Sequence, residues 1–166
     1  MPPVQLLDEA LLARVTREAL ASPRLRTNHN FHAGPEDNPH RFLNAMARGT
    51  YVTPHRHLSP PKAESFILLR GAVACFLFDD AGDVTEIHRL GGAGEPLGID
   101  VAAGIWHSLV VRSDVAILYE VKPGPWVPAT DKEFAPWAPR EGTTGCPRYL
   151  RALEERLHRY APSQEL

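Results

Sequence analysis

Short apolar runs with a period of two constrain the fold of this sequence more than any other feature. Six such runs lie at 66–69, 73–78, 84–90, 97–101, 108–112 and 115–121. Turn-forming pairs such as Arg70-Gly71 and Ser113-Asp114 separate them. Short strands at regular spacing, with no long helix between them, are typical of a sandwich or a barrel. We therefore expect an all-β fold.

Helical periodicity is confined to the two ends of the chain. Apolar residues recur at helical spacing over 8–21, where Asp8 is a good N-cap, and again over 148–160. Residues 27–44 are polar and irregular, and a short helical turn is expected at 40–46. The proline-dense stretch 123–139 should run extended outside the sheets, since proline cannot donate to a ladder. We expect a single domain with an N-terminal helix and extended segment over 1–48, a barrel core over 49–122, and a tail with a final helix over 123–166.

The composition limits the possible classes of function. With 166 residues, 43% of them hydrophobic, the chain is long enough for one domain with a buried core. A net charge of −2 provides no basic surface for nucleic acid. No apolar run is long enough to cross a bilayer, and the N-terminus lacks the basic start of a signal peptide. We expect a cytoplasmic protein that binds a small-molecule ligand and forms a homodimer, with no nucleic acid or membrane partner.

Four residues form a candidate metal site. His55 and His57 are two residues apart, so on a strand their imidazoles point to the same face. Glu64 shares a face with Phe66, where an acid is costly unless it is paired or bound to metal. His107 opens another apolar run. Each residue has an ordinary alternative, because such a histidine pair also arises by chance and a histidine on an apolar face is more often a core residue.

The spacing of these residues resembles the two motifs of the cupin superfamily. The first motif is matched by Gly49, His55, His57, Glu64 and Gly71, and the second by Gly98, Gly104 and His107. The gap between His57 and Glu64 is longer than usual, and Ala102 and Val111 stand where proline and asparagine are common. The resemblance implies a cupin double-stranded β-helix, or jelly-roll barrel, with flanking N- and C-terminal helices. It also implies one divalent metal ion, held by His55, His57, Glu64 and His107.

A closer resemblance, over most of the chain, is to the cupin-fold metalloproteins of the WbuC family. The matching stretches are 22–26, 30–32, 41–44, 49–57, Glu64, 69–71, 106–107 and 120–125. This family shares the longer gap before Glu64. Its name comes from O-antigen polysaccharide gene clusters, which implies a link to surface polysaccharide biosynthesis but fixes no reaction.

Four further residues are candidates for binding a substrate. Asn30 and His32 alternate like strand residues and could enter the cavity beside the metal, although capping of turns explains them equally well. Tyr51 lies four positions before His55, so in an unbroken strand it shares the inward face. Arg41 could bind an acidic group, with a surface ion pair as the alternative.

Two alternating charges on the last strand, Glu120 and Lys122, are interpreted as a pair with each other. Trp106 should point away from the neighbouring His107 and pack under a flanking helix.

These residues leave three functions open. The first is a metal-dependent enzyme acting on a small polar molecule such as a sugar or sugar derivative, isomerase- or epimerase-like or oxygenase-like. The second is a non-catalytic metal-dependent module that binds or senses a small molecule. The third is a metal-free sugar epimerase with a histidine as general base, against which the complete set of four ligands argues. Mixed nitrogen and oxygen ligands suit Fe, Mn, Ni or Zn, and the pattern does not choose among them.

Overall fold

A computed structural model describes residues 2–160 and contains ten strands and two helices in that range. The helices are α1 (Glu9–Ala21) and α2 (Cys146–Arg159). The strands are β1 (Arg26–Asn30), β2 (His40–Ala47), β3 (His55–Arg56), β4 (Glu64–Arg70), β5 (Val73–Phe78), β6 (Val84–Leu90), β7 (Gly98–Val101), β8 (Trp106–Val111), β9 (Val115–Lys122) and β10 (Glu133–Phe134).

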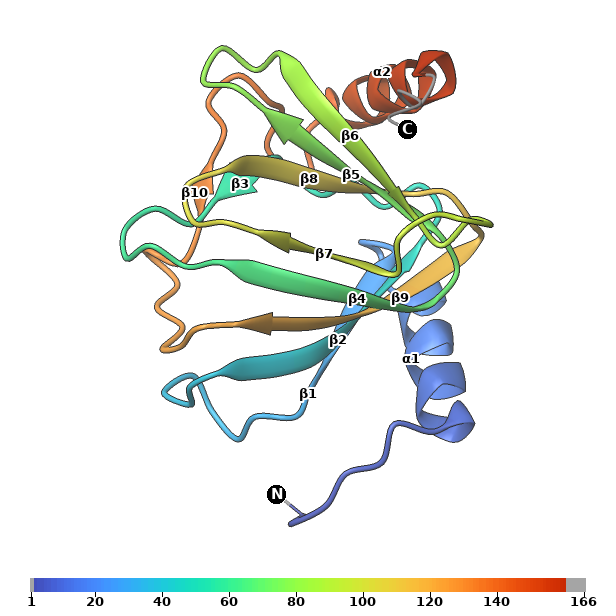
Figure 1. The fold of residues 1–166 in the computed structure, drawn as a ribbon, viewed down its shortest axis with the longest axis vertical. Helices are drawn as coiled ribbons and strands as arrows, with labels where there is room; N and C mark the ends of the chain where they lie inside the picture. The colour runs from blue at the N-terminus through green and yellow to red at the C-terminus, as the bar shows by residue number, and fades with distance from the viewer. Residues whose placement is uncertain (1, 161–166) are drawn as a thin grey trace.

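The strands form two antiparallel sheets that face each other as a jelly-roll barrel (Figure 1). One sheet has the order β1-β2-β9-β4-β7 and the other the order β10-β3-β8-β5-β6. The chain crosses repeatedly between the sheets, as in the double-stranded β-helix that the motifs implied. The all-β prediction is confirmed.

The inward face of the strands changes from apolar to polar at one level of the barrel. On β9 the inward series runs from Leu118 in the core to Glu120 and Lys122, and on β8 it runs from Leu109 to His107. The apolar end is a packed core in which Leu118 and Leu109 join the side chains of Met46, Phe66, Val73, Cys75, Leu90, Val101, Val111 and Ala116. One end of the barrel is therefore closed by this core, and polar groups line the other end.

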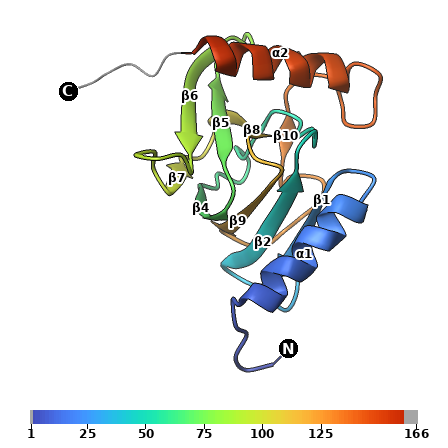
Figure 2. The same cartoon turned by 90° about the vertical axis from the view of Figure 1, so that its right-hand side faces the viewer.

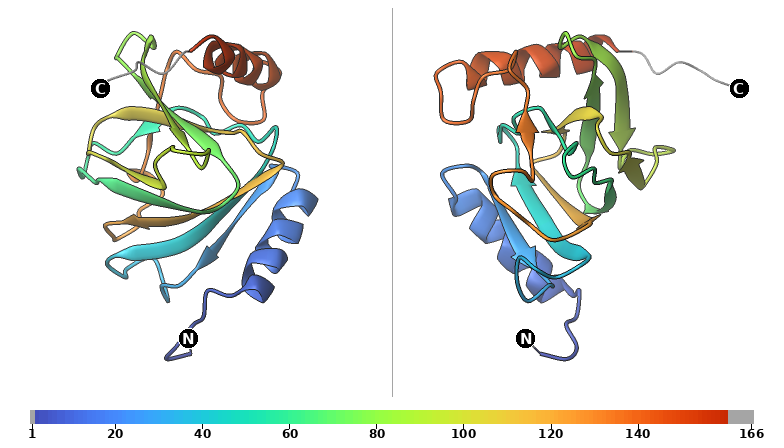
Figure 3. Two further views of the ribbon diagram at one scale, coloured as in Figure 1. Left: turned by 45° about the vertical axis from the view of Figure 1, so that its right-hand side comes forward. Right: turned by 90° about the vertical axis from the view of Figure 1, so that its left-hand side faces the viewer.

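The two helices cover opposite sheets from the outside (Figures 2 and 3). Helix α1 begins after Asp8, whose carboxylate accepts the backbone N–H of Leu11 at 2.8 Å, and it buries Val15 and Ala19 against the outer side of β2 and β9. Helix α2 buries three leucines against β5 and β8, and Trp106 packs beneath it as expected. Both predicted helices are confirmed, although α2 begins two residues earlier than expected.

Two expectations about the flanks are wrong. Residues 40–46 form strand β2 in place of a helical turn, because β2 pairs along its whole length with β9 and over residues 42–46 with β1. This pairing satisfies the backbone across a central strand, so tertiary context outweighs the weak local signal. The proline-dense tail does join a sheet at one point, where Glu133 pairs with Arg56 and Phe134 with His55.

Neither helix in the described range is long and apolar enough to cross a membrane.

Gly71, in the turn that carries the chain from β4 to β5, provides a test of the barrel's geometry. Its φ is +79°, and a Cβ there would overlap the carbonyl oxygen of Val115. Gly94 has a similar φ of +77°, but a Cβ there meets nothing within 4 Å. We expect Gly71→Ala to lower the free energy of unfolding by about 3 kcal/mol or more, against about 1 kcal/mol for the backbone cost alone in Gly94→Ala. Urea denaturation measures both, and equal losses would contradict the close approach of Gly71 to β9.

Candidate metal centre

The structure brings the four predicted metal ligands together at the polar end of the barrel. His55 lies on β3 directly opposite His107 on β8, and His57 follows β3. Glu64 begins β4 and reaches the same point from the facing sheet. All four side chains are at most 4% exposed, and one ligand atom of each lies within 4.8 Å of all the others.

Backbone carbonyls orient all three imidazoles. The Nδ1 of His55 lies 2.9 Å from the carbonyl oxygen of Thr53, and that of His107 lies 2.9 Å from the carbonyl of Ile105. The Nδ1 of His57 contacts the carbonyl of Asp131. A carbonyl oxygen only accepts, so each Nδ1 carries the proton. Each ring therefore directs its Nε2 toward the centre, as in metal-binding histidines.

The three Nε2 atoms meet the carboxylate of Glu64 at this centre. The Nε2 of His57 lies 2.9 Å from Oε1 of Glu64, but neither atom has a partner with hydrogen-bond geometry. The Nε2 of His107 lies 3.0 Å from Oε2 of Glu64. The Nε2 of His55 is buried and has no partner among residues 2–160. Lone pairs gathered around a carboxylate repel one another unless a cation lies between them. The donor set therefore fits a divalent metal ion.

The pKa values favour ligand forms of these groups. Burial lowers the pKa of His55 well below its usual value, and the nearby charge of Lys132 adds to this, so the ring is neutral. Burial raises the pKa of Glu64, but its contacts with His107 and His57 and the charge of Lys132 outweigh that effect and hold its pKa well below the usual value. A neutral imidazole and an ionised carboxylate are the forms that bind metal.

A buried ion-pair network supports this centre from one side. Asp131 pairs with Lys62 at 2.9 Å and with Lys122 at 2.7 Å, while its carbonyl holds His57. Lys122 also lies 3.4 Å from Glu64. The expected pair of Glu120 with Lys122 is therefore wrong, because the tail brings Asp131 to the lysine instead.

Two residues of this network, Lys62 and Asp131, are not singled out by the sequence analysis, although the sequence holds a signal. The chain contains only three lysines against fifteen arginines. All three lysines, Lys62, Lys122 and Lys132, lie at this end of the barrel. Lysine is the more compact cation and its pKa responds to burial, so its restriction to one region of a fold indicates a site.

Glu120 provides an acid in its protonated form. It is 4% exposed and accepts a hydrogen bond of 3.1 Å from the side-chain amide of Asn44. Burial and the charge of Glu64 raise its pKa to about 8. At pH 7 the carboxyl group of Glu120 can therefore donate a hydrogen bond or a proton.

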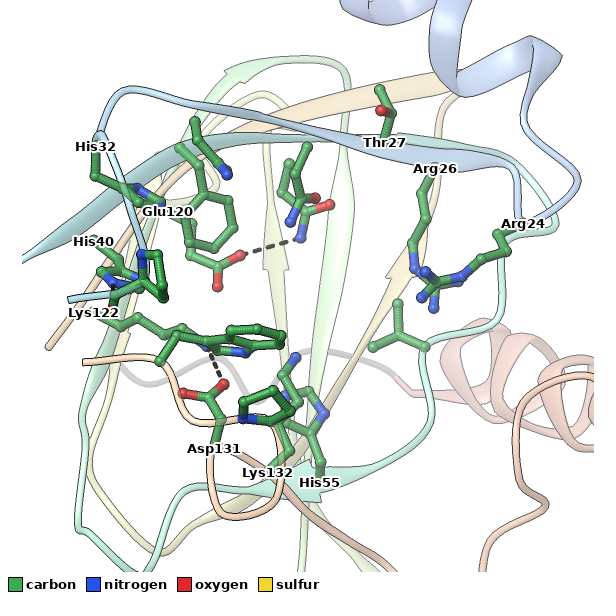
Figure 4. Close-up of a pocket in the computed structure, with 18 of the residues that line it drawn as sticks. Arg24, Arg26, Thr27, His32, His40, His55, Glu120, Lys122, Asp131 and Lys132 are labelled. Carbon is green, nitrogen blue, oxygen red and sulfur yellow. Dashed lines mark hydrogen bonds and ion pairs between the residues drawn. The ribbon is translucent and has the colours of Figure 1, made fainter. Parts of the chain in front are cut away.

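A cavity of about 870 Å³ opens beside the metal candidate (Figure 4). His55 and Lys132 lie on one side of it, and Glu120 and Lys122 on the other. Two of the predicted substrate-binding residues, Asn30 and His32, line this cavity, and the ring of His32 stacks on that of His40 with centroids 4.1 Å apart. Their role in binding stays a prediction.

The other two candidates for substrate binding lie elsewhere. The ring of Tyr51 packs against Tyr149 of α2, and its hydroxyl donates to the carbonyl of Pro139 at 2.7 Å. Tyr51 was expected to share the inward face of His55, but β3 contains only two residues, so the strand alternation does not extend back to Tyr51. Arg41 is exposed and borders a separate hollow with the N-terminal segment, because its neighbours on β2, His40 and Phe42, take the inward positions.

Comparisons with known proteins agree with the fold. The model of a family described as a domain of unknown function (DUF6016) matches residues 7–90. No curated protein matches the sequence.

Solved structures resemble this chain at low sequence identity. Protein SO0799 from Shewanella oneidensis has a TM-score of 0.51 and 14% identity, over 64% of this chain and 72% of its own. The capsular polysaccharide assembling protein CapF from Staphylococcus aureus has a TM-score of 0.54 and 18% identity, over 69% of this chain but only 32% of its own. L-ribose isomerase from Cellulomonas parahominis, solved with L-psicose, has a TM-score of 0.53 and 16% identity, over 68% of this chain and 70% of its own. Such identities show the fold alone.

Removal of one imidazole tests the metal centre. We expect one divalent ion per chain in the wild type and a loss of about tenfold or more in affinity in His57→Ala, since the remaining donors no longer enclose the ion. The matched control is His88→Ala, because the side chain of His88 is 42% exposed and pairs only with Glu86. Elemental analysis measures the metal, and unchanged content in His57→Ala would contradict the assignment. Both variants should melt cooperatively, because the apolar core is separate from the site.

Removal of the charge of Asp131 tests the supporting network. Asp131→Asn leaves the buried ammonium of Lys62 without a counter-charge and that of Lys122 with Glu64 alone, which we expect to cost about 3 kcal/mol of unfolding free energy at pH 7. Burial raises the pKa of Asp131, but the hydrogen bonds and charges of Lys122 and Lys62 outweigh it and lower the pKa. The ion pairs of Asp131 therefore stabilise the fold fully at pH values above the pKa of Asp131 in the unfolded chain, about 3.9. This stabilisation is lost as the pH falls through the lower pKa that Asp131 has in the folded protein.

Urea denaturation at pH 7 and pH 3 checks this dependence. The difference in unfolding free energy between wild type and Asp131→Asn should be smaller at pH 3 than at pH 7. A difference of constant size would contradict the stabilising role of the Asp131 carboxylate. Asp114→Asn is the control, because Asp114 is fully exposed and should change stability by less than about 0.5 kcal/mol at either pH.

Proposed function

We propose that this chain, which belongs to the DUF6016 family of domains of unknown function, is a metal-dependent enzyme that acts on a small polar molecule such as a sugar or sugar derivative. The observation that carries the proposal is the convergence of three Nε2 atoms and the carboxylate of Glu64 beside an open cavity. His55 belongs to both, because its unpartnered Nε2 faces the centre and its side chain lines the cavity. A ligand in the cavity can therefore reach the metal, as catalytic sites require.

We propose that His55, His57, Glu64 and His107 hold the ion. A divalent ion bound there would polarise a carbonyl or hydroxyl group, and iron would add oxygen chemistry. The neutral carboxyl of Glu120 supplies a proton donor on the opposite wall, and Lys122 holds Glu64 in place from the side. These roles fit an isomerase- or epimerase-like reaction, or an oxygenase-like one with iron; Fe, Mn, Ni and Zn all suit the ligands.

Two kinds of likeness support a sugar as the substrate class. L-ribose isomerase and CapF share the fold, and the first was solved with a ketose. The stretches that resemble the WbuC family include the metal residues and 120–125, which lead into the cavity wall. We propose on this basis that the chain is of the WbuC type and acts in surface polysaccharide biosynthesis.

Exchange of substrate hydrogens with solvent tests the enzymatic proposal. The protein is loaded separately with Fe(II), Mn(II), Ni(II) and Zn(II), and incubated in D₂O with aldoses, ketoses and uronic acids. We expect deuterium at the carbon beside the carbonyl for at least one metal and substrate, read by NMR, or oxygen uptake with Fe(II). Glu64→Gln and His57→Ala should abolish either signal, and Asp114→Asn should retain it.

The alternative is a non-catalytic binding or sensing module, and the same open metal position favours it. A metal-loaded protein that binds a sugar without hydrogen exchange or oxygen uptake would contradict the enzyme and support this alternative. Turnover that survives complete removal of the metal would contradict both and support a metal-free epimerase.

The expected homodimer stays a prediction, which the mass of the protein in solution tests.

A further inference from the structure

Lys132 is the one lysine of the chain that has no counter-ion in the described residues. Lys62 and Lys122 both pair with Asp131. For residues 2–160, no carboxylate lies within 4.0 Å of the Lys132 ammonium, and no hydrogen bond involves it. Figure 4 shows its side chain beside that of His55, on the cavity side of the metal candidate.

The charges around the centre leave an excess of cations. Three ammonium groups, those of Lys62, Lys122 and Lys132, face two ionised carboxylates, Glu64 and Asp131. Glu120 does not correct the balance at pH 7, because its pKa is about 8. A divalent ion among the four ligands would increase the excess, so the site is complementary to an anionic ligand.

The wall opposite Lys132 consists of neutral hydrogen-bonding groups. Asn28 and Asn30 on β1, Asn44 on β2 and Glu120 on β9 all line the cavity. The Oδ1 of Asn44 is buried and has no partner within residues 2–160. Amides and a protonated carboxyl both donate and accept, as a row of hydroxyl groups on a ligand requires.

We propose that Lys132 binds the carboxylate of a hydroxylated acid, such as a sugar acid, whose hydroxyl groups lie along the wall formed by Asn28, Asn30, Asn44 and Glu120. This inference rests on the proposed function and specifies its substrate class. Two guanidinium groups, those of Arg24 and Arg26, also line the cavity, but both pair with Glu141, so the cation left unpaired there among the described residues is the ammonium of Lys132. A single ammonium suits a carboxylate, whereas phosphate sites commonly use guanidinium forks or helix N-termini. Desolvation lowers the pKa of Lys132, as expected for a half-buried cation whose counter-ion arrives with the ligand.

Two probes that differ only at one carbon test the proposal. D-gluconate and D-glucitol share a chain of hydroxyl groups, but only gluconate carries a carboxylate. Calorimetry on the zinc-loaded protein should show gluconate binding at least about tenfold more tightly than glucitol, the usual loss when a charged hydrogen bond is removed. Lys132→Met should remove the preference, Lys132→Arg should retain part of it, and Arg17→Met, which removes an exposed cation of α1, should leave it unchanged.

A second measurement does not require metal. Because the chain has three lysines, ¹³C-lysine labelling gives three Cε signals, and the one missing in Lys132→Arg identifies Lys132. Gluconate should shift that signal in zinc-loaded and in metal-free protein. If zinc fails to bind but the signal shifts, the metal-dependent function fails and the lysine site stands.

Three results would overturn the inference while the metal centre stands. These are equal affinity for gluconate and glucitol, a preference that survives in Lys132→Met with zinc fully bound, and tighter Lys132-dependent binding of glucitol 6-phosphate than of gluconate. The last would assign the lysine to a phosphate.

Discussion

The candidate site depends on three backbone carbonyls that accept the Nδ1 protons of the three histidines. Without these contacts each imidazole could rotate or change tautomer, and the lone pairs would have no common target. Two of the carbonyls, those of Thr53 and Ile105, lie two residues before the histidine that they orient, so the turn into each strand sets the ring. The third comes from Asp131, more than seventy residues after His57.

Asp131 joins the tail, the barrel and the site in one residue. Its carboxylate neutralises Lys62, from the loop before β4, and Lys122, at the end of β9. Short pairing of β10 with β3 holds the tail in position, and it places Phe134 and Lys132 at the cavity. Segment 123–139 is thus a wall of the site as well as a covering of the surface. This segment provides charged groups to the site, whereas the two sheets position most of the candidate metal ligands.

The barrel could be predicted because it follows from local periodicity, and the four clustered residues because their spacing resembles the cupin motifs. Alternation placed His55 and His57 together, and an acid in register with Phe66 required a partner. Residues whose position depends on long-range pairing could not be found in this way. Strand β2 was mistaken for a helical turn because its partner β9 lies seventy residues later, and Tyr51 was placed wrongly because β3 is too short to carry the alternation back to it. The role of Asp131 depends on a fold of the tail that proline content alone does not determine, although the scarcity of lysine was visible from the start.

The contribution of Asp131 also has a consequence for biosynthesis. The four residues that surround the candidate ion have all been translated by residue 107, but the carbonyl that orients His57 arrives only with residue 131. A nascent chain held between these lengths has its donors but lacks the contact that fixes one ring and the acid that neutralises two lysines. The centre is therefore completed only when the tail packs against β3.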